Sequence, residues 1–193
     1  MSPEQKSPQK LKDIAADWWG ALQPDPDRHR PGDRAALAQL RRCSRPEDAI
    51  EVPAALALAR ALGARDGHDR RLGDFLATAI VLAHVRKDDR DNRMARQLGA
   101  AVQGERALLS PLRLARLLAA QTPEERIAAF RRAVALADHK VNLRDLADAM
   151  LDWSHPVAGE RIRIAWAFAY HNVPSPTGDL AAPIPSPTAG DQV

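Results

Sequence analysis

The sequence has little of what builds disulfide-stabilised, zinc-binding or membrane proteins. Cys43 is the only cysteine, which excludes an intrachain disulfide and a cysteine-rich zinc site. No apolar run approaches the roughly 20 residues that a membrane-spanning helix needs. The opening segment MSPEQKSPQKLKD also lacks the apolar stretch of a signal peptide. We therefore expect a cytoplasmic protein that does not enter a membrane.

Motifs of common enzymes are also missing. The chain contains no GxGxxG, GxxxxGK[ST], GxSxG or HExxH motif. His68 and Asp69 are adjacent, as in some helical metal-dependent phosphohydrolases, but they lie in the glycine-flanked polar segment RDGHDRRLG, which is typical of a solvated loop. We predict no catalytic residue, no metal site and no cofactor, and keep such a hydrolase as the weakest alternative.

The residues that are abundant favour helices. Alanine, leucine and arginine dominate while valine and isoleucine are sparse, and 45% of the residues are apolar, enough to bury a core. We predict an all-α protein, a compact bundle of about eight to ten helices in two small lobes. The lobes are expected at residues 10–85 and 86–171, divided at the charged turn RKDDRDN. Residues 1–9 and the tail 172–193, which has five prolines, are expected to be disordered.

Apolar residues at helical spacing and capping residues give the expected helix boundaries. Thr122 with Glu125, and Ser44 with Glu47, have the spacing of a capping box, and the second pair predicts a short helical turn. The segment 72–85 is apolar all round, which indicates a helix at the centre of the core. Helices are expected over residues 10–22, 34–43, 53–62, 72–85, 93–102, 111–120, 123–137, 143–153 and 159–171.

The net charge of +3 is distributed unevenly along the chain. Residues 84–144 contain 13 basic and 7 acidic side chains, so this segment carries more positive charge than the whole chain. A basic excess confined to one segment is expected of a protein that binds nucleic acid. Solvated arginines without a ligand are the alternative interpretation.

Two consecutive helices within this segment carry arginines that lack well-placed acidic neighbours: Arg113 and Arg116 in the first, Arg131 and Arg132 in the second. Guanidinium groups without carboxylate partners repel one another, and they match phosphate in bidentate geometry. The alternative is that their aliphatic stems only cover apolar surface. The buried stripe of the first helix is expected at Leu112, Ala115, Leu118 and Ala119, with Leu114 and Leu117 at its edge. In the second helix Ile127, Phe130, Val134 and Ala137 are expected to face inward.

Aromatic residues are few, which bears on how nucleic acid would bind. The chain has eight Phe, Trp and Tyr residues, most of them on apolar stripes, whereas base-stacking platforms need exposed rings. Binding is therefore expected through the sugar–phosphate backbone, with little sequence preference. Trp18 and Trp19 point about 100° apart on a helix, so one is expected in the core and the other near the surface, with Trp19 the candidate contact for a partner protein. Trp153 and Trp166 are expected in the core.

The order of these segments resembles the CasB family, the small subunit of the type I-E CRISPR surveillance complex Cascade. The resemblance covers about residues 15–171. It rests on the aromatic pair in ADWWGAL, on RAALAQLRRCSRPEDAIEVPAAL, on the spacing of the arginine helices, and on VNLRDLADAMLDW with the closing Trp helix RIRIAWAFAYH. The segment RKDDRDNRMARQLG departs from the small-residue helix usual in the family.

The resemblance implies an all-helical, non-catalytic subunit that assembles with other Cascade subunits and lies head to tail with a second copy of itself. It also implies contact with the CRISPR guide RNA and with target DNA, whose displaced single strand the subunit would stabilise. The residues that match family segments are Arg41 and Arg42 in LRR, Arg113 and Arg116 in RLARLL, and Arg131 and Arg132 in FRR. Charge clustering adds Arg86, Lys87, Arg90, Arg93 and Arg96, and with less support Arg144, which is close to Asp145 and Asp148.

A protein of another class could carry the same charge pattern. A helical adaptor that binds only proteins, and no nucleic acid, would place these arginines against acidic surfaces of its partners. The sequence leaves this alternative open.

Overall fold

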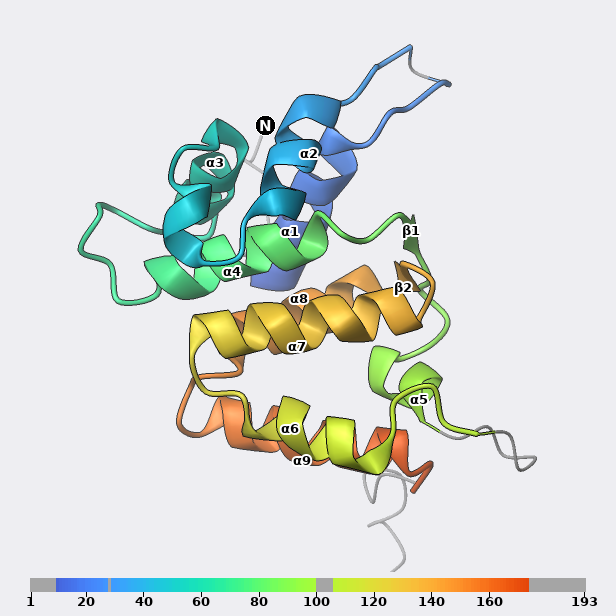
Figure 1. Ribbon diagram of the computed structural model, residues 1–193. Coiled ribbons are helices and arrows are strands. Elements are labelled where there is room, and N and C mark those ends of the chain that lie inside the picture. Colours follow the sequence, from blue (N-terminus) through green and yellow to red (C-terminus); the bar gives the residue numbers. More distant parts are fainter. Residues whose placement is uncertain (1–9, 28, 100–105, 174–193) are drawn as a thin grey trace, which may run out of the picture.

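The computed structural model describes residues 10–27, 29–99 and 106–173. Within these ranges the chain forms nine α-helices, one short 3-10 helix and two short strands, which confirms the predicted all-α class (Figure 1). The disorder predicted for residues 1–9 and for most of the tail concerns positions outside the described residues. The elements are α1 (Leu11–Leu22), α2 (Arg34–Arg42), η1 (Pro46–Ala49), α3 (Pro53–Ala61), α4 (Leu72–Leu82), β1 (Lys87–Asp88), α5 (Met94–Leu98), α6 (Pro111–Ala119), α7 (Pro123–Leu136), β2 (Lys140–Val141), α8 (Leu143–Asp152) and α9 (Ala158–Tyr170).

Polar side chains cap the helices where the sequence predicted helix starts. The Oγ1 of Thr122 accepts a hydrogen bond from the amide of Glu125 at 3.2 Å, and the Glu125 carboxylate accepts one from the amide of Thr122, so the predicted capping box is confirmed. The side chains of Asp33, Ser110 and Asn142 accept comparable bonds at the starts of α2, α6 and α8. These local bonds satisfy amides that have no partner inside their helix.

The predicted capping box at Ser44 and Glu47 is wrong in its residues. The 3-10 helix η1 does form in this region, but its acid is Asp48, which accepts hydrogen bonds from the amides of Ser44 and Arg45 at 2.8 and 3.0 Å. These two bonds are the main reason why the pKa of Asp48 lies below its usual value. The turn begins one residue later than the Ser-x-x-Glu spacing indicated, because Arg45 remains extended.

A two-stranded parallel sheet follows α4 and α7 and was not predicted. Lys87 pairs with Lys140 and Asp88 with Val141, and the first strand lies in the segment that was expected to be a charged turn. Two-residue strands are too short to show an alternating apolar pattern. The pairing ties the chain after α4 to the chain after α7.

Helix α4 lies at the centre of the core, as predicted. Every side chain from Phe75 to Leu82 is buried, and the helix packs against α3, η1, α7 and α8. Helix α1 packs on α8, and α9 packs on α5 and α8. The division into two lobes near residue 86 remains a prediction.

Three aromatic side chains form the part of the core between α7, α8 and α9. Phe130, Trp153 and Trp166 meet edge to face, with ring centroids 5.0 to 5.7 Å apart. The indole N–H of Trp153 donates to the carbonyl of Ala120 at 3.0 Å. The prediction that Trp153 and Trp166 belong to the core is confirmed.

Trp18 and Trp19 differ less than the sequence suggested. Both are partly buried against the core, and each indole N–H donates to a backbone carbonyl, Trp18 to Ala54 at 2.8 Å and Trp19 to Val85 at 3.3 Å. The expected contrast between one core and one surface tryptophan is therefore wrong. The neighbouring helix α3 and the chain after α4 each cover one ring.

None of the described helices combines the length and apolar composition that a membrane crossing requires.

Candidate nucleic-acid interface

The predicted arginines separate into groups according to the partners that the structure gives them. One group already has carboxylate partners. Arg90 pairs with Asp88 at 2.9 Å, and Arg144 pairs with Asp13 at 2.8 Å and more loosely with Asp88 at 3.9 Å. The sequence had pointed to Asp145 and Asp148 as the acids near Arg144, but its partners come from α1 and β1. These two arginines are less available to an anion than the charge count suggested.

A second group donates to carbonyls at helix ends. Arg131 on α7 donates from Nη1 to the carbonyl of Cys43 at 3.1 Å and from Nη2 to that of Arg41 at 3.4 Å. Arg41 in turn donates from Nε to Ala83, just after α4, at 2.7 Å. Carbonyls at a helix C-terminus lack intrahelical partners and carry partial negative charge. They orient both guanidinium groups without cancelling their full positive charge.

These guanidinium groups surround a partly buried histidine. Burial, with Arg131, Arg41 and His139 nearby, lowers the pKa of His84 from 6.5 to about 4. Burial and the charge of Arg86 also lower the pKa of Arg41. The corner formed by the ends of α2 and α4 with the middle of α7 therefore has a positive potential at neutral pH while His84 is uncharged.

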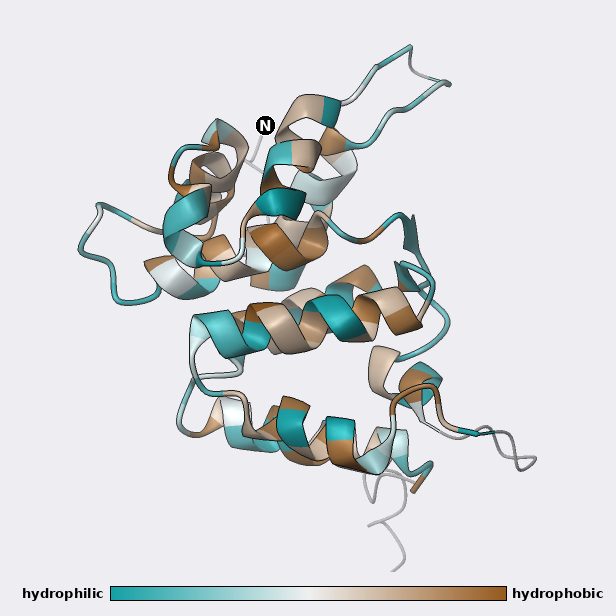
Figure 2. Cartoon of the chain, viewed as in Figure 1, coloured by the Kyte–Doolittle hydropathy of each residue, from teal (hydrophilic) through white to brown (hydrophobic). Residues whose placement is uncertain are grey.

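A third group lines a groove between α6 and α7. Arg113 and Arg116 from α6 and Arg132 from α7 are exposed, and they border an open groove of about 510 Å³. Its lining contains no acidic residue, and among the described residues none of the three arginines has a carboxylate within ion-pair distance. Hydrophilic stretches alternate with hydrophobic ones along both helices (Figure 2). We call this surface the α6–α7 groove.

Helix α6 buries a different face from the one predicted. The expected buried stripe included Leu112, which is 63% exposed, with Ala115 and Ala119, which are exposed as well. Leu118 is half-buried against the core, and the buried residues are Leu114 and Leu117, which were expected only at the edge of the stripe. Leucines at several positions of a nine-residue helix allow two apolar faces, and packing against α7 selects one. On α7 the predicted inward residues are all buried: Ile127, Phe130, Val134 and Ala137.

Apolar residues form the floor of the α6–α7 groove, and none of them belongs to the predicted binding residues. Leu109 and Leu117 lie at its base, while Ala129, Ala135 and Leu136 line its α7 side. The spacing of 129, 132 and 136 places an arginine between small and apolar residues on one helical face. That pattern was present in the sequence, but only the position of α6 shows that this face borders a groove.

The remaining predicted residues lie apart from the groove lining. Arg42, Arg86 and Lys87 are exposed at the end of α2 and in the segment after α4, near the corner held by Arg41. Arg96 donates from Nε to the side-chain oxygen of Asn172 at 2.8 Å. Helix α7 thus links the predicted arginines of α2, which it contacts through Arg131, with those of α6, which share the groove with Arg132. Arg96 is instead held beside the end of α9.

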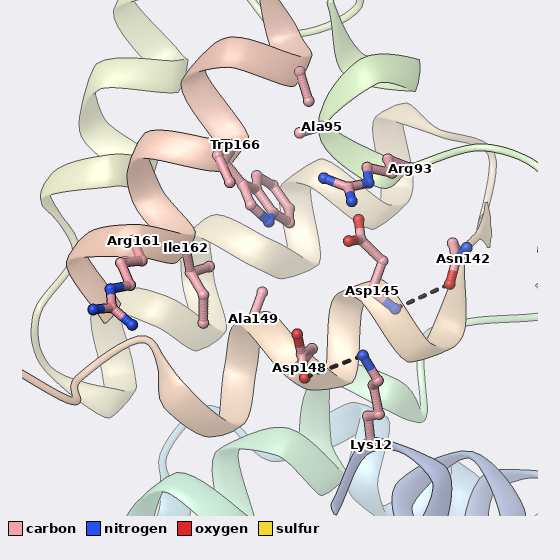
Figure 3. A pocket seen from close by; sticks show the side chains of 12 residues that line it. Lys12, Arg93, Ala95, Asn142, Asp145, Asp148, Ala149, Arg161, Ile162 and Trp166 are labelled. Carbon is pink, nitrogen blue, oxygen red and sulfur yellow. Dashed lines mark hydrogen bonds and ion pairs between the residues drawn. The ribbon is translucent and has the colours of Figure 1, made fainter. Parts of the chain in front are cut away.

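Arg93 belongs to a second cavity, of about 460 Å³, among α1, α5, α8 and α9 (Figure 3). Asp145 points into this cavity beside Arg93 and accepts a hydrogen bond from the amide of Met94 at 2.9 Å. Burial raises the pKa of Asp145, and the Met94 amide and Arg93 oppose that rise. Lys12 and Asp148, which also line the cavity, form an ion pair at 3.6 Å. Because its lining has both signs of charge, this cavity matches a polyanion less well than the α6–α7 groove.

The two residues that the sequence offered for metal or nucleophilic chemistry, His68 and Cys43, lie in unfavourable surroundings. His68 is exposed in its loop, and within residues 10–27, 29–99 and 106–173 no three His, Cys, Asp or Glu side chains gather as metal ligands. Cys43 is buried, and burial followed by the charge of Asp48 raises the pKa of its thiol. A thiol held in the neutral form is a poor nucleophile.

The fold and this surface define an all-helical protein with a basic groove. Comparison with protein families identifies a match to the family described as CRISPR-associated protein Cse2 over residues 36–171. The chain therefore belongs to the Cse2 family, the small subunit of the CRISPR Cascade complex, and the resemblance to the CasB family is confirmed. Other Cascade subunits are accordingly its partners. Neither the search of curated proteins nor that of solved structures found a match to the chain.

Proposed function

We propose that this subunit is non-catalytic and binds the backbone of nucleic acid in the cytoplasm. In this role it supports engagement of the guide RNA with its target and stabilises the displaced DNA strand of the R-loop during antiviral defence. The single observation that carries the proposal is the α6–α7 groove, where Arg113, Arg116 and Arg132 border a lining without any acid. Guanidinium groups bind phosphate in bidentate geometry, and a polyanion relieves the repulsion among them.

The energetics of an R-loop make a few such contacts sufficient. The RNA–DNA heteroduplex is about as stable as the DNA duplex that it replaces, so formation of the R-loop is nearly balanced. Each phosphate contact also releases counterions, which gives binding without sequence preference. Three contacts to the displaced strand would therefore shift the balance toward the open state.

The corner beside α7 extends this surface. Arg131 and Arg132 are adjacent on α7, and the first faces Arg41 and Cys43 while the second borders the α6–α7 groove. We assign Arg41, Arg42, Arg86, Lys87 and Arg131 to the continuation of the nucleic-acid path. Arg90, Arg93, Arg96 and Arg144 remain weaker candidates. Arg90 and Arg144 pair with carboxylates, Arg96 is held at the end of α9, and Arg93 lines a cavity that also contains acids.

Protein contacts form the other part of the proposal. Ile164 and Phe168, four residues apart on α9, are 50% and 37% exposed. Residues at this spacing share one helical face, so they offer an apolar contact to another subunit or to a second copy placed head to tail. Trp19 remains a candidate partner contact through the exposed part of its ring. The exposed α9 face also supports the alternative of a purely protein-binding adaptor.

Binding of a fluorescent single-stranded DNA at low salt distinguishes the nucleic-acid-binding subunit from the purely protein-binding adaptor. We expect the full chain to bind it, and we expect the groove triple variant, Arg113→Gln, Arg116→Gln and Arg132→Gln, to bind at least about tenfold more weakly. The control triple variant removes three other exposed arginines: Arg60→Gln, Arg65→Gln and Arg70→Gln. Equal affinity of both folded variants contradicts the proposal, and absence of binding by the wild-type chain favours the adaptor.

A further inference from the structure

The lining of the α6–α7 groove contains apolar residues as well as arginines, and contacts with phosphate would involve only the arginines. Positions 113, 116 and 117 fall on one face of α6, and positions 129, 132 and 136 on one face of α7. Each face therefore presents both arginine and apolar residues to the same space. The groove has a volume of about 510 Å³, which gives room for more than a phosphate group.

The apolar floor indicates which part of a nucleotide enters. Leu109 and Leu117 are buried beneath the groove, so its accessible apolar surface comes from Ala129, Ala135 and Leu136, which are half-buried or exposed. A phosphodiester is charged and gains nothing from apolar surface, whereas the flat face of a nucleobase does. Guanidinium planes also stack on bases, so a base can be held here without an aromatic ring.

The arginines complement the rest of the same ligand. Arg113, Arg116 and Arg132 stand around the floor with no acid in the lining, so the groove attracts an anion at its rim and an apolar face at its base. An unpaired nucleotide in a polynucleotide presents both features together. In a duplex the base faces are stacked inside, and only the phosphates could reach the rim.

We propose that the α6–α7 groove binds an unpaired nucleotide of a single strand, with its base on the apolar floor and its phosphates among the three guanidinium groups. This inference rests on the proposed function and adds that the groove contacts the base of an unpaired nucleotide as well as its backbone. Selection among bases is weak, because every base has a π-face. Single-stranded DNA and RNA share this chemistry, and separate measurements distinguish them.

The test compares two single strands of equal length and charge, a normal oligonucleotide and one made of abasic nucleotides. We expect the full-length wild-type chain to bind the normal strand about tenfold more tightly at the same salt, since stacking contributes that order per base. The comparison is made with DNA and repeated with RNA, and the arm with the larger ratio identifies the preferred strand. Equal affinity for normal and abasic strands in both arms overturns the inference.

A variant that fills the floor without changing charge gives the second measurement. Ala129→Leu with Ala135→Leu should reduce the ratio of the affinity for the normal strand to that for the abasic strand toward one. The affinity for the abasic strand itself should stay unchanged. The matched control, Ala57→Leu with Ala61→Leu on exposed positions of α3, should keep the wild-type ratio. A filled floor that leaves the ratio intact in a folded protein overturns the assignment of the base to this groove.

The outcomes also separate this inference from the proposed function. If wild-type protein binds normal and abasic strands equally, and the groove triple variant binds both more weakly, backbone binding holds and the base site does not. If it binds neither strand, both fail. A polyglutamate peptide that competes with the normal strand as well as the unlabelled strand does would mark the groove as a site for acidic protein, against the inference.

Discussion

Arg126 lies 1% exposed between α7 and α4, where its guanidinium forms an ion pair with Asp74. The same guanidinium donates to the carbonyls of Thr122 at 3.3 Å and Met150 at 3.5 Å, and Ser154 Oγ donates to the second oxygen of Asp74 at 2.7 Å. Of the five arginines between residues 109 and 134, Arg126 therefore has a structural role, since it joins α7 to α4 and α8. The other four reach the surface or a helix end.

Removing this buried charge should destabilise the fold. Arg126→Met leaves Asp74 partly buried without its cation, which costs about 3 to 5 kcal/mol in comparable buried pairs. Urea denaturation followed by circular dichroism would measure the loss, and Arg132→Met, at an exposed position of the same helix, should change stability by less than about 0.5 kcal/mol. Similar losses for the two variants would contradict the structural role of Arg126.

Close packing of α9 against the end of α8 depends on Gly159. A Cβ at this position would overlap the carbonyl oxygen of Trp153 and lie 2.9 Å from that of Asp152. Gly159→Ala should therefore displace α9 and destabilise the protein by about 1 to 3 kcal/mol. Gly20→Ala in α1, where a Cβ meets nothing within 4 Å, should instead stabilise it by about 0.5 to 1 kcal/mol. Thermal denaturation distinguishes the two, and equal melting temperatures would contradict the close approach.

His84 should make stability depend on pH in a defined window. Burial, followed by Arg131, Arg41 and His139, lowers its folded-state pKa to about 4, whereas the unfolded chain has the ordinary value of 6.5. Between these values the unfolded state binds more protons, so stability falls as the pH drops from 6.5 toward 4 and has no His84 dependence above that range.

We expect His84 to account for about 2 kcal/mol of this loss, allowing for its partial exposure. The measurement is the difference in unfolding free energy between pH 7 and pH 4.5, in wild type and in His84→Gln. The variant should lose less stability than wild type over that interval. An identical pH dependence of the two proteins would show that His84 protonates as freely in the folded state as in the unfolded one.

The helices could be predicted from the sequence because their signals are local. Asp33 and the Thr122–Glu125 pair lie within one turn of the amides that they cap, and α4 is apolar on every side. The face that α6 buries could not be predicted in the same way. Leu112 and Leu114 have the same hydrophobicity, and only the position of α7 decides that the second is buried.

Only some residues of the candidate site could be predicted from the sequence, for a related reason. The sequence pattern of arginines without well-placed acidic neighbours singled out Arg113, Arg116 and Arg132, since this pattern lies within a few helical turns. It could not show that Arg131 donates to carbonyls 88 and 90 residues earlier, because those contacts follow from the packing of α7 on the end of α2. It also could not reveal that Leu117 closes the floor of a groove.

The salt dependence of single-strand binding tests the central claim most directly, because it counts the phosphate contacts that a set of charges makes. The slope of log affinity against log salt concentration is about −0.7 for each phosphate contacted on a single strand. We expect the groove triple variant, which lacks Arg113, Arg116 and Arg132, to have a slope shallower than wild type by about 2, and the control triple variant to keep the wild-type slope. A groove triple variant that folds and keeps the wild-type slope would show that these guanidinium groups do not meet phosphate.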